Sequence, residues 1–119
     1  MPRRRKAPTL APAASQDIRE LLQWSEEKFG QSVAVRYRAL LKQALRDVQA
    51  DPERPGSKER PELTTGGIRT YPISFSRSRV GGPGVKNPRH VLVYRYDSDV
   101  IEIVRVLHDA RDLERHVHD

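Results

Sequence analysis

Residues 12–50 decide the fold, and they read PAASQDIRELLQWSEEKFGQSVAVRYRALLKQALRDVQA. In the first half of this stretch, apolar or small side chains recur every three or four positions, the period of one helix face: Ile18, Leu21, Leu22, Ser25 and Phe29. The second half carries a more complete stripe of the same period: Val33, Tyr37, Leu40, Leu41, Ala44, Leu45 and Val48. The stretch therefore predicts two amphipathic helices.

The ends of these helices are marked by residues with special backbone preferences. Pro12 suits a first helical position, because the N–H that it lacks would be unpaired there. Gly30 ends the first helix because it adopts left-handed conformations at little cost. Ser32 is expected to cap the second helix, and the Asp51-Pro52 pair ends it near Ala50. The short break predicts an antiparallel helical hairpin, whose apolar stripes need a sheet to cover them.

Strands are predicted on both sides of the hairpin. Upstream, residues 9–11 could form a short strand, although three residues do not prove one. Downstream, residues 51–67 are rich in proline, glycine and charge, and predict a surface connection with no core of its own. Residues 67–75 alternate as a strand does, and Pro72 within them favours an edge position, where a missing donor is harmless.

The last part of the chain predicts a β-hairpin at the centre of the sheet. Residues 89–96 and 100–107 are joined by a short polar turn and carry apolar side chains on both faces. Residues 76–89 predict a long basic loop, and residues 109–119 a frayed helical turn. The fold class is therefore α+β: an N-terminal strand and an antiparallel helical hairpin on a mostly antiparallel sheet of about four strands.

The predicted turn also fixes which residues of the β-hairpin face each other. With a two-residue loop at Ser98 and Asp99, Arg95 lies opposite Glu102. This opposite-charge pair explains the presence of both residues by a structural role. The same register places Arg105 opposite Leu92, with no carboxylate facing it. The strand register therefore explains the charge of Arg105 less well than that of Arg95.

Composition bounds the remaining possibilities. The chain has 119 residues, 22 Lys plus Arg against 16 Asp plus Glu, a net charge of +6, and no cysteine. Thiol chemistry and disulfides are excluded, and no apolar run approaches the ~20 residues that span a bilayer. We expect a flexible basic arm over residues 1–8, one domain over 9–119, and a cytoplasmic location without a signal peptide. The charge favours an acidic partner without choosing its class.

Several segments together resemble one family. The segments are Pro12-Ala13-Ala14 with Asp17-Ile18, Lys28-Phe29-Gly30, the run from Asn87 to Arg95, and the run from Ile101 to Asp112. They are similar to the ParE-type toxins of the RelE/ParE superfamily over about residues 9–116. The resemblance implies a toxin of a type II toxin-antitoxin system, held inactive in a hetero-oligomer by an acidic ParD-like antitoxin. The ParE branch is associated with inhibition of DNA gyrase, and the RelE branch with ribosome-dependent cleavage of mRNA.

The residues separate these two branches only in part. A nuclease needs a proton donor or base and cations around the scissile phosphate, and the candidates here are Arg69, Arg105 and His108. Against this, Asp109 follows His108, and no tyrosine follows in Leu113-Glu114-Arg115. The favoured interpretation is a toxin that inhibits gyrase by binding, without catalytic residues, cofactor or metal, and with RNA cleavage as the alternative.

The candidate residues for partner binding are cations and one aromatic: Trp24, Arg69, Arg77, Arg79, Arg105, His108 and Arg111. For each of them a structural role competes. Trp24 could pack half-buried or anchor a partner helix, and Arg111 could close a local salt bridge. His116 and His118 lack a third ligand nearby, so no metal site is expected. The basic loop shows no interleaved aromatic residue for stacking on bases, so direct nucleic-acid binding is not expected.

Overall fold

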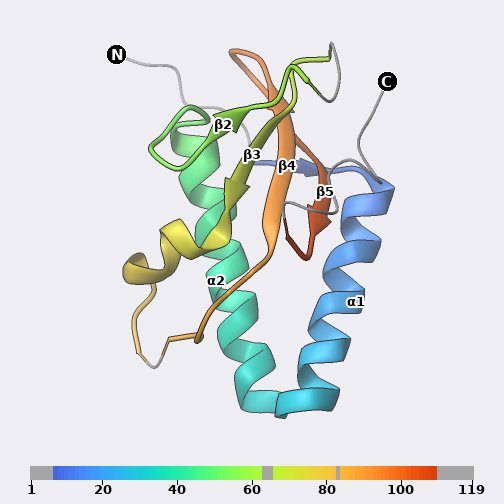
Figure 1. Ribbon diagram of the computed structural model, residues 1–119, viewed down its shortest axis with the longest axis vertical. Helices are drawn as coiled ribbons and strands as arrows, with labels where there is room; N and C mark the ends of the chain where they lie inside the picture. The colour runs from blue at the N-terminus through green and yellow to red at the C-terminus, as the bar shows by residue number, and fades with distance from the viewer. Residues whose placement is uncertain (1–6, 63–65, 83, 110–119) are drawn as a thin grey trace.

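A helical hairpin covers one face of a five-stranded sheet in the computed structural model, which describes residues 7–62, 66–82 and 84–109 (Figure 1). The element order is β1 (Thr9–Leu10), α1 (Pro12–Phe29), α2 (Gln31–Ala50), β2 (Lys58–Glu59), β3 (Arg69–Pro72), the 3-10 helix η1 (Ile73–Arg79), β4 (Val91–Tyr96) and β5 (Ile101–Leu107). In space the strands follow the order β1-β5-β4-β3-β2. β1 runs parallel to β5, and the other neighbours are antiparallel. Most of the predicted basic arm and of the predicted terminal helical turn lies outside the described residues.

The predicted helical hairpin is confirmed, with one correction at its turn. Pro12 stands at the start of α1, and Gly30 has φ of 93°. The sequence predicted Ser32 as the cap of the second helix, but α2 begins at Gln31 with Gly30 as its N-cap and without a side-chain cap. Because the positive φ of Gly30 reverses the chain within one residue, α2 starts directly after it, and the carbonyl of Gly30 accepts the N–H of Ala34 as the first hydrogen bond of the helix.

The middle of the chain contains more structure than the sequence indicated. Residues 51–67 were predicted as a surface connection only, but Lys58–Glu59 form β2 and bring the sheet to five strands rather than about four. The strand predicted over 67–75 ends at Pro72, and residues 73–79 form η1 in place of the expected strand end and loop start. β3 is an internal strand, but β2 pairs only with Arg69 and Thr70, so Pro72 lies beyond its reach.

The central hairpin of β4 and β5 confirms half of the predicted register. Arg95 lies opposite Glu102 and donates to it at 2.8 Å, and the carboxylate of Asp97 accepts the N–H groups of Asp99 and Val100 in the turn. A β-bulge then shifts the pairing, so that Arg105 lies opposite Val93 and not Leu92. One extra residue on β5 causes this shift, which an ideal ladder does not anticipate.

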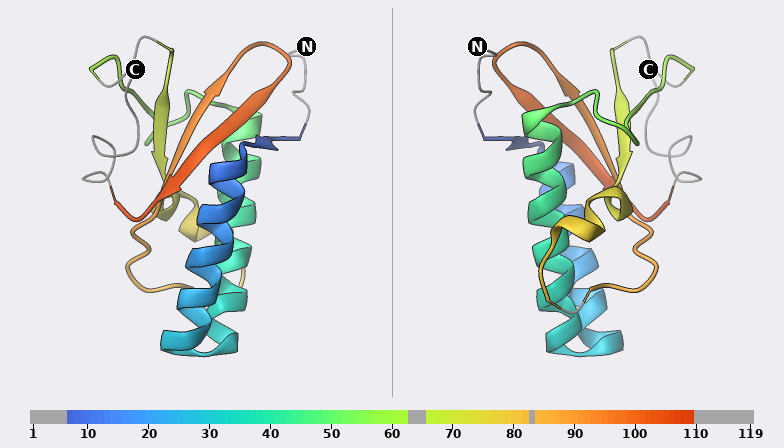
Figure 2. Two further views of the ribbon diagram at one scale, coloured as in Figure 1. Left: turned by 90° about the vertical axis from the view of Figure 1, so that its right-hand side faces the viewer. Right: turned by 90° about the vertical axis from the view of Figure 1, so that its left-hand side faces the viewer.

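Both faces of the central strands are buried, as their apolar composition predicted. The main core fills the space between the helices and the sheet, and includes Leu40, Leu41, Tyr71, Leu92, Tyr94, Ile101 and Ile103. A smaller cluster on the opposite face joins Ile68, Val93 and Leu107. The hairpin of α1 and α2 extends past the end of the sheet, and the segment between η1 and β4 runs beside this extension (Figure 2).

A buried carboxylate ties α2 to η1. Asp47 is 2% exposed, and its oxygens accept hydrogen bonds from Ser76 at 2.6 Å, Gln43 at 2.9 Å and Arg79 Nε at 2.9 Å. The guanidinium of Arg54 lies 3.4 Å away. These donors come from α2, from the segment after it and from η1, so one side chain fixes the position of the segment that leads into residues 80–90.

Replacing Gly56 by alanine is expected to lower the free energy of unfolding by about 1–3 kcal/mol. Gly56 has φ of +97°, and a Cβ built on it would lie 2.7 Å from Cγ of Phe75. Urea unfolding of the variant measures this loss. Gly67→Ala is the matched control, because Gly67 also has a positive φ but has open space around its Cβ position. Equal losses of stability in the two variants would show that the contact with Phe75 does not cause the effect of Gly56→Ala.

Candidate functional site

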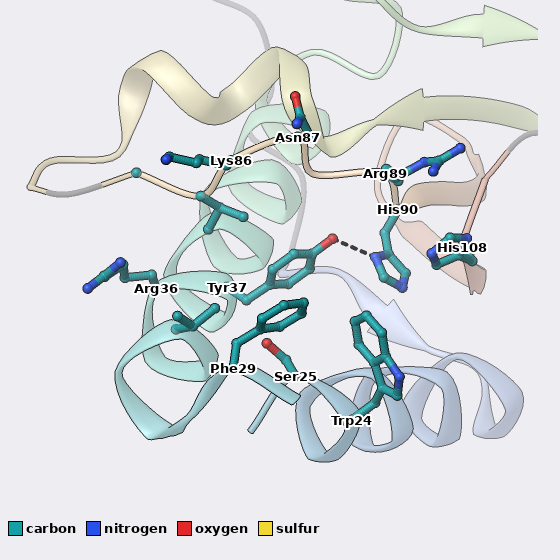
Figure 3. A pocket seen from close by; sticks show the side chains of 13 residues that line it. Trp24, Ser25, Phe29, Arg36, Tyr37, Lys86, Asn87, Arg89, His90 and His108 are labelled. Atoms are coloured by element: carbon teal, nitrogen blue, oxygen red, sulfur yellow. Dashed lines mark hydrogen bonds between the residues drawn. The ribbon is translucent and has the colours of Figure 1, made fainter. Parts of the chain in front are cut away.

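A hollow of about 520 Å³ opens between the far end of the helical hairpin and the segment before β4 (Figure 3). α1 contributes Trp24, Ser25 and Phe29, and α2 contributes Val33, Arg36 and Tyr37. The opposite wall consists of residues 84–87, 89 and 90, together with His108 just after β5. Segments far apart in the sequence therefore meet at this hollow, which we call the aromatic pocket.

Two exposed aromatic side chains form one wall of the aromatic pocket. Trp24 is 46% exposed and Phe29 is 60% exposed, and their rings meet edge to face with centroids 5.6 Å apart. Trp24 is therefore about half exposed, which leaves its indole accessible to a partner, and its role as an anchor stays a prediction. Phe29 was predicted as a member of the buried stripe of α1, which is wrong, because α1 has already passed the end of the sheet at that point.

A row of polar rings lies deeper in the pocket. The hydroxyl of Tyr37 and Nδ1 of His90 share a hydrogen bond of 2.5 Å. The ring of His90 is buried and meets those of Tyr37 and His108 edge to face, with centroids 5.3 and 5.2 Å apart. Burial raises the pKa of the Tyr37 phenol to about 12, against a smaller lowering by the backbone at His90 and Arg89. The phenol therefore stays neutral near pH 7 and keeps its proton for hydrogen bonding.

The rim of the aromatic pocket is positively charged. Arg36, Lys86 and Arg89 line it, and no carboxylate stands among the described residues that do. The charge of Arg89 is offset in part by Asp109, at 3.7 Å between Nη2 and Oδ2. Arg36 and Lys86 have no carboxylate partner among the described residues, and an apolar aromatic wall beside them suits a ligand that combines an apolar group with negative charge.

A second hollow adjoins the aromatic pocket and shares Trp24, His90 and His108 with it. Arg105 lies in this second hollow and forms two hydrogen bonds with the carboxylate of Asp17, at 2.7 and 2.8 Å. The same carboxylate accepts the backbone N–H of Val106 at 2.9 Å. These bonds to Asp17 are the main reason that the pKa of Arg105 is raised.

The charge of Arg105 thus has a structural partner, contrary to the prediction from strand register. The register considered only strand neighbours, whereas Asp17 reaches β5 from α1, 88 positions earlier in the chain. The same carboxylate also satisfies a backbone N–H group of β5. Asp17 and Arg105 therefore hold α1 against β5 and fix one side of the second hollow.

The structure brings only some of the predicted site residues together. Trp24, Arg105 and His108 line the second hollow. Arg69 lines neither hollow, because it starts β3 and its Nε donates to Ser57 at 2.8 Å. Arg77 and Arg79 lie on η1, while Arg111, His116 and His118 fall outside the described residues. Of the three nuclease candidates, Arg105 and His108 are neighbours and Arg69 is apart from them.

Sequence reasoning missed most residues of the aromatic pocket: Phe29, Arg36, Tyr37, Lys86 and His90. Tyr37 and Phe29 were assigned to core stripes, and Lys86 to the long basic loop over residues 76–89. One signal was present for Phe29, which stands with Trp24 at the end of a helix next to a glycine. Such an end projects from the domain when the sheet is shorter than the helices.

The described part of the chain offers neither a metal centre nor a membrane-crossing helix. Within residues 7–62, 66–82 and 84–109, no group of three or more His, Asp or Glu side chains is arranged to hold a metal ion. No helix in the same ranges has the length and apolar character needed to cross a bilayer.

Comparisons with known proteins agree with this fold. The sequence model of the family described as "ParE toxin of type II toxin-antitoxin system, parDE" matches residues 9–113. A solved structure of the chromosomal ParDE toxin-antitoxin system from P. aeruginosa has a chain that superposes with a TM-score of 0.63 at 14% identity. The match covers 90% of this chain and 99% of that one. No curated protein matches the sequence significantly. The chain belongs to the ParE toxin family of type II toxin-antitoxin systems.

Proposed function

We propose that this ParE toxin inhibits DNA gyrase by binding to it, and that a ParD-like antitoxin neutralises the toxin in a hetero-oligomer. The observation that carries the proposal is the aromatic pocket, with exposed Trp24 and Phe29 beside Arg36 and Lys86. Gyrase acts on chromosomal DNA, so the site of action would be the cytoplasm.

The pocket supports an acidic, amphipathic antitoxin segment as the ligand. An apolar side chain of such a segment would fill the hollow against Trp24 and Phe29, and its carboxylates would meet the cations at the rim. Aromatic side chains in such hollows are the residues that dominate binding energies at protein interfaces. The cations would speed association and exclude partners with a basic surface.

Action by binding rather than by catalysis is supported by the state of the nuclease candidates. Arg105 is held in two hydrogen bonds by Asp17, and Arg69 is bonded to Ser57 in another part of the sheet. Neither arginine is arranged around a common position for a phosphate. Inhibition by binding needs only a surface that holds one conformational state of the target more tightly than another.

The gyrase target is tested with purified proteins. Saturating toxin is expected to inhibit DNA supercoiling by gyrase, and addition of the antitoxin from the adjacent reading frame is expected to restore it. Unchanged supercoiling at saturation would overturn the gyrase target, and a mixture of toxin and antitoxin without complex formation would overturn the neutralisation.

The alternative is a ribosome-dependent mRNA endoribonuclease, and the shared hollow of Arg105 and His108 is the observation in its favour. Primer extension on mRNA after induction of the toxin distinguishes the two functions. We expect no cuts positioned by codons in growth-arrested cells. Such cuts, together with normal supercoiling by gyrase, would replace the proposed function with the alternative.

A further inference from the structure

The outer face of α2 carries a row of cations that the aromatic pocket does not use. Arg38, Lys42 and Arg46 are all exposed and follow each other at intervals of four residues. At a rise of 1.5 Å per residue, the row is about 12 Å long on one side of the helix. Arg36, on the rim of the aromatic pocket, lies about 200° around the axis from Arg38, so the two cationic surfaces face different directions.

The row is not balanced by negative charge within the described residues. Arg38, Lys42 and Arg46 have no hydrogen-bond or ion-pair partner there. The acidic residue of α2, Asp47, is buried and already accepts the donors described above. Four cations on a helix whose sole carboxylate is buried leave a positive potential on the outer face of α2.

η1 and the residues after it turn this row into a groove. A hollow of about 470 Å³ lies between α2 and η1, and its lining includes Arg79, Val80 and Gly81 opposite the three cations of α2. Arg79 binds Asp47 through Nε, yet its side chain stays 55% exposed. The bond to the buried carboxylate therefore holds a fourth cation at the edge of the groove.

We propose that this basic groove contacts the phosphate backbone of duplex DNA. Phosphate contacts need only positive charge at matching positions, whereas the anchors of protein interfaces are enriched in tryptophan and tyrosine, and valine is under-represented among them. The groove has four cations and no aromatic side chain among its lining residues. Without aromatic side chains it also has no platform for the bases of a single strand. The aromatic pocket on the other side of α2 has the anchors that a protein requires.

The choice of DNA over another phosphodiester rests on the proposed function, because gyrase holds duplex DNA while it acts. A toxin bound to gyrase would then touch both the enzyme and the DNA. Net charge alone favoured an acidic partner of any class, and the family resemblance pointed to an acidic antitoxin. Of the four cations on α2, Arg36 lies at the aromatic pocket and the other three lie along the basic groove.

The test compares the full-length toxin with two variants that lose the same net charge. The groove variant is R38Q/K42Q/R46Q, and the control is R19Q/K28Q/K58Q, three exposed cations on α1 and β2. Binding to a short labelled DNA duplex is measured by fluorescence anisotropy over a series of salt concentrations. Circular dichroism and thermal unfolding verify that both variants keep the fold.

We expect the groove variant to bind duplex DNA at least about tenfold more weakly than the wild type at low salt. The slope of log K against log salt should flatten by about 0.9 for each phosphate that the toxin no longer neutralises, so by about 2.7. The control variant should stay within about threefold of the wild type. Equal losses of affinity in both variants, or no duplex binding by the wild type, would overturn the inference.

Two further measurements separate the remaining outcomes. Tighter binding of the groove to a polyglutamate peptide than to the duplex would overturn DNA as its ligand. Gyrase supercoiling is assayed in parallel, so that the two proposals fail separately. If the groove variant loses DNA binding but the wild type does not inhibit gyrase, gyrase is overturned as the target and the DNA-binding groove stands. If the wild type inhibits gyrase but the groove variant binds DNA as tightly as the wild type, the groove is overturned as the DNA-binding surface and the gyrase target stands.

Discussion

Replacing Asp47 by alanine is expected to lower the free energy of unfolding by about 2–4 kcal/mol, because buried hydrogen-bond donors lose a charged acceptor. The substitution removes the acceptor of three hydrogen bonds and leaves the donors of Gln43, Ser76 and Arg79 without their partner. Ser76 is itself fully buried, so water does not easily take the place of the carboxylate. Urea unfolding monitored by circular dichroism measures the change.

Two other variants serve as controls for Asp47→Ala. Asp47→Asn keeps an acceptor but removes the charge, so it should lose less than Asp47→Ala. Glu26→Ala removes an exposed carboxylate from α1, and should change stability by less than about 0.5 kcal/mol. A loss below about 1 kcal/mol for Asp47→Ala would show that the buried network does not hold η1 in place.

The elements with strong periodicity were predictable from the sequence, and those that depend on tertiary contacts were not. The helical stripes and Gly30 gave the hairpin of α1 and α2 almost to the residue. β2 was missed because a two-residue strand has no period, and its place is set by pairing with β3. The bulge on β5 was missed because a uniform ladder has no reason to shift after the pair of Tyr94 and Ile103.

The same contrast between local sequence pattern and tertiary contact decides which residues of the candidate site could be predicted. Trp24 and His108 stood out by residue type, and both line the aromatic pocket. Tyr37 comes from α2 and His90 from the residue before β4, and only the fold brings the hydroxyl and the ring nitrogen into contact. Asp17 could not be assigned to Arg105 from sequence, because the helix and strand that carry them are distant in the chain.

The fold also explains how one small domain can present two cationic surfaces. α2 packs on the sheet through one side, and its remaining circumference is divided between the aromatic pocket and the basic groove. The segment from η1 to β4 passes along both, since residues 79–81 line the groove and residues 84–87 line the pocket. Asp47 anchors the start of this segment, so its loss should disturb both surfaces.

Replacing Trp24 by alanine is expected to cost about 2–4 kcal/mol of antitoxin binding, the range of a dominant aromatic contact, or about 30-fold to 1000-fold in Kd. The indole is nearly half exposed and forms the wall shared by both hollows. It contributes little to the core, so the fold should survive its removal. Isothermal titration of the toxin with the antitoxin measures the loss.

Val35→Ala is the matched control for Trp24→Ala, because Val35 is 59% exposed and lines the basic groove on α2. We expect this variant to bind the antitoxin within about threefold of the wild type, since small changes at exposed positions outside an interface have little effect. Wild-type affinity in Trp24→Ala would place the antitoxin elsewhere on the toxin. A comparable loss of affinity in Val35→Ala would extend the interface across α2, because Val35 and the aromatic pocket lie on different sides of that helix. Only a loss confined to Trp24→Ala assigns the acidic partner to the aromatic pocket and leaves the groove available for DNA.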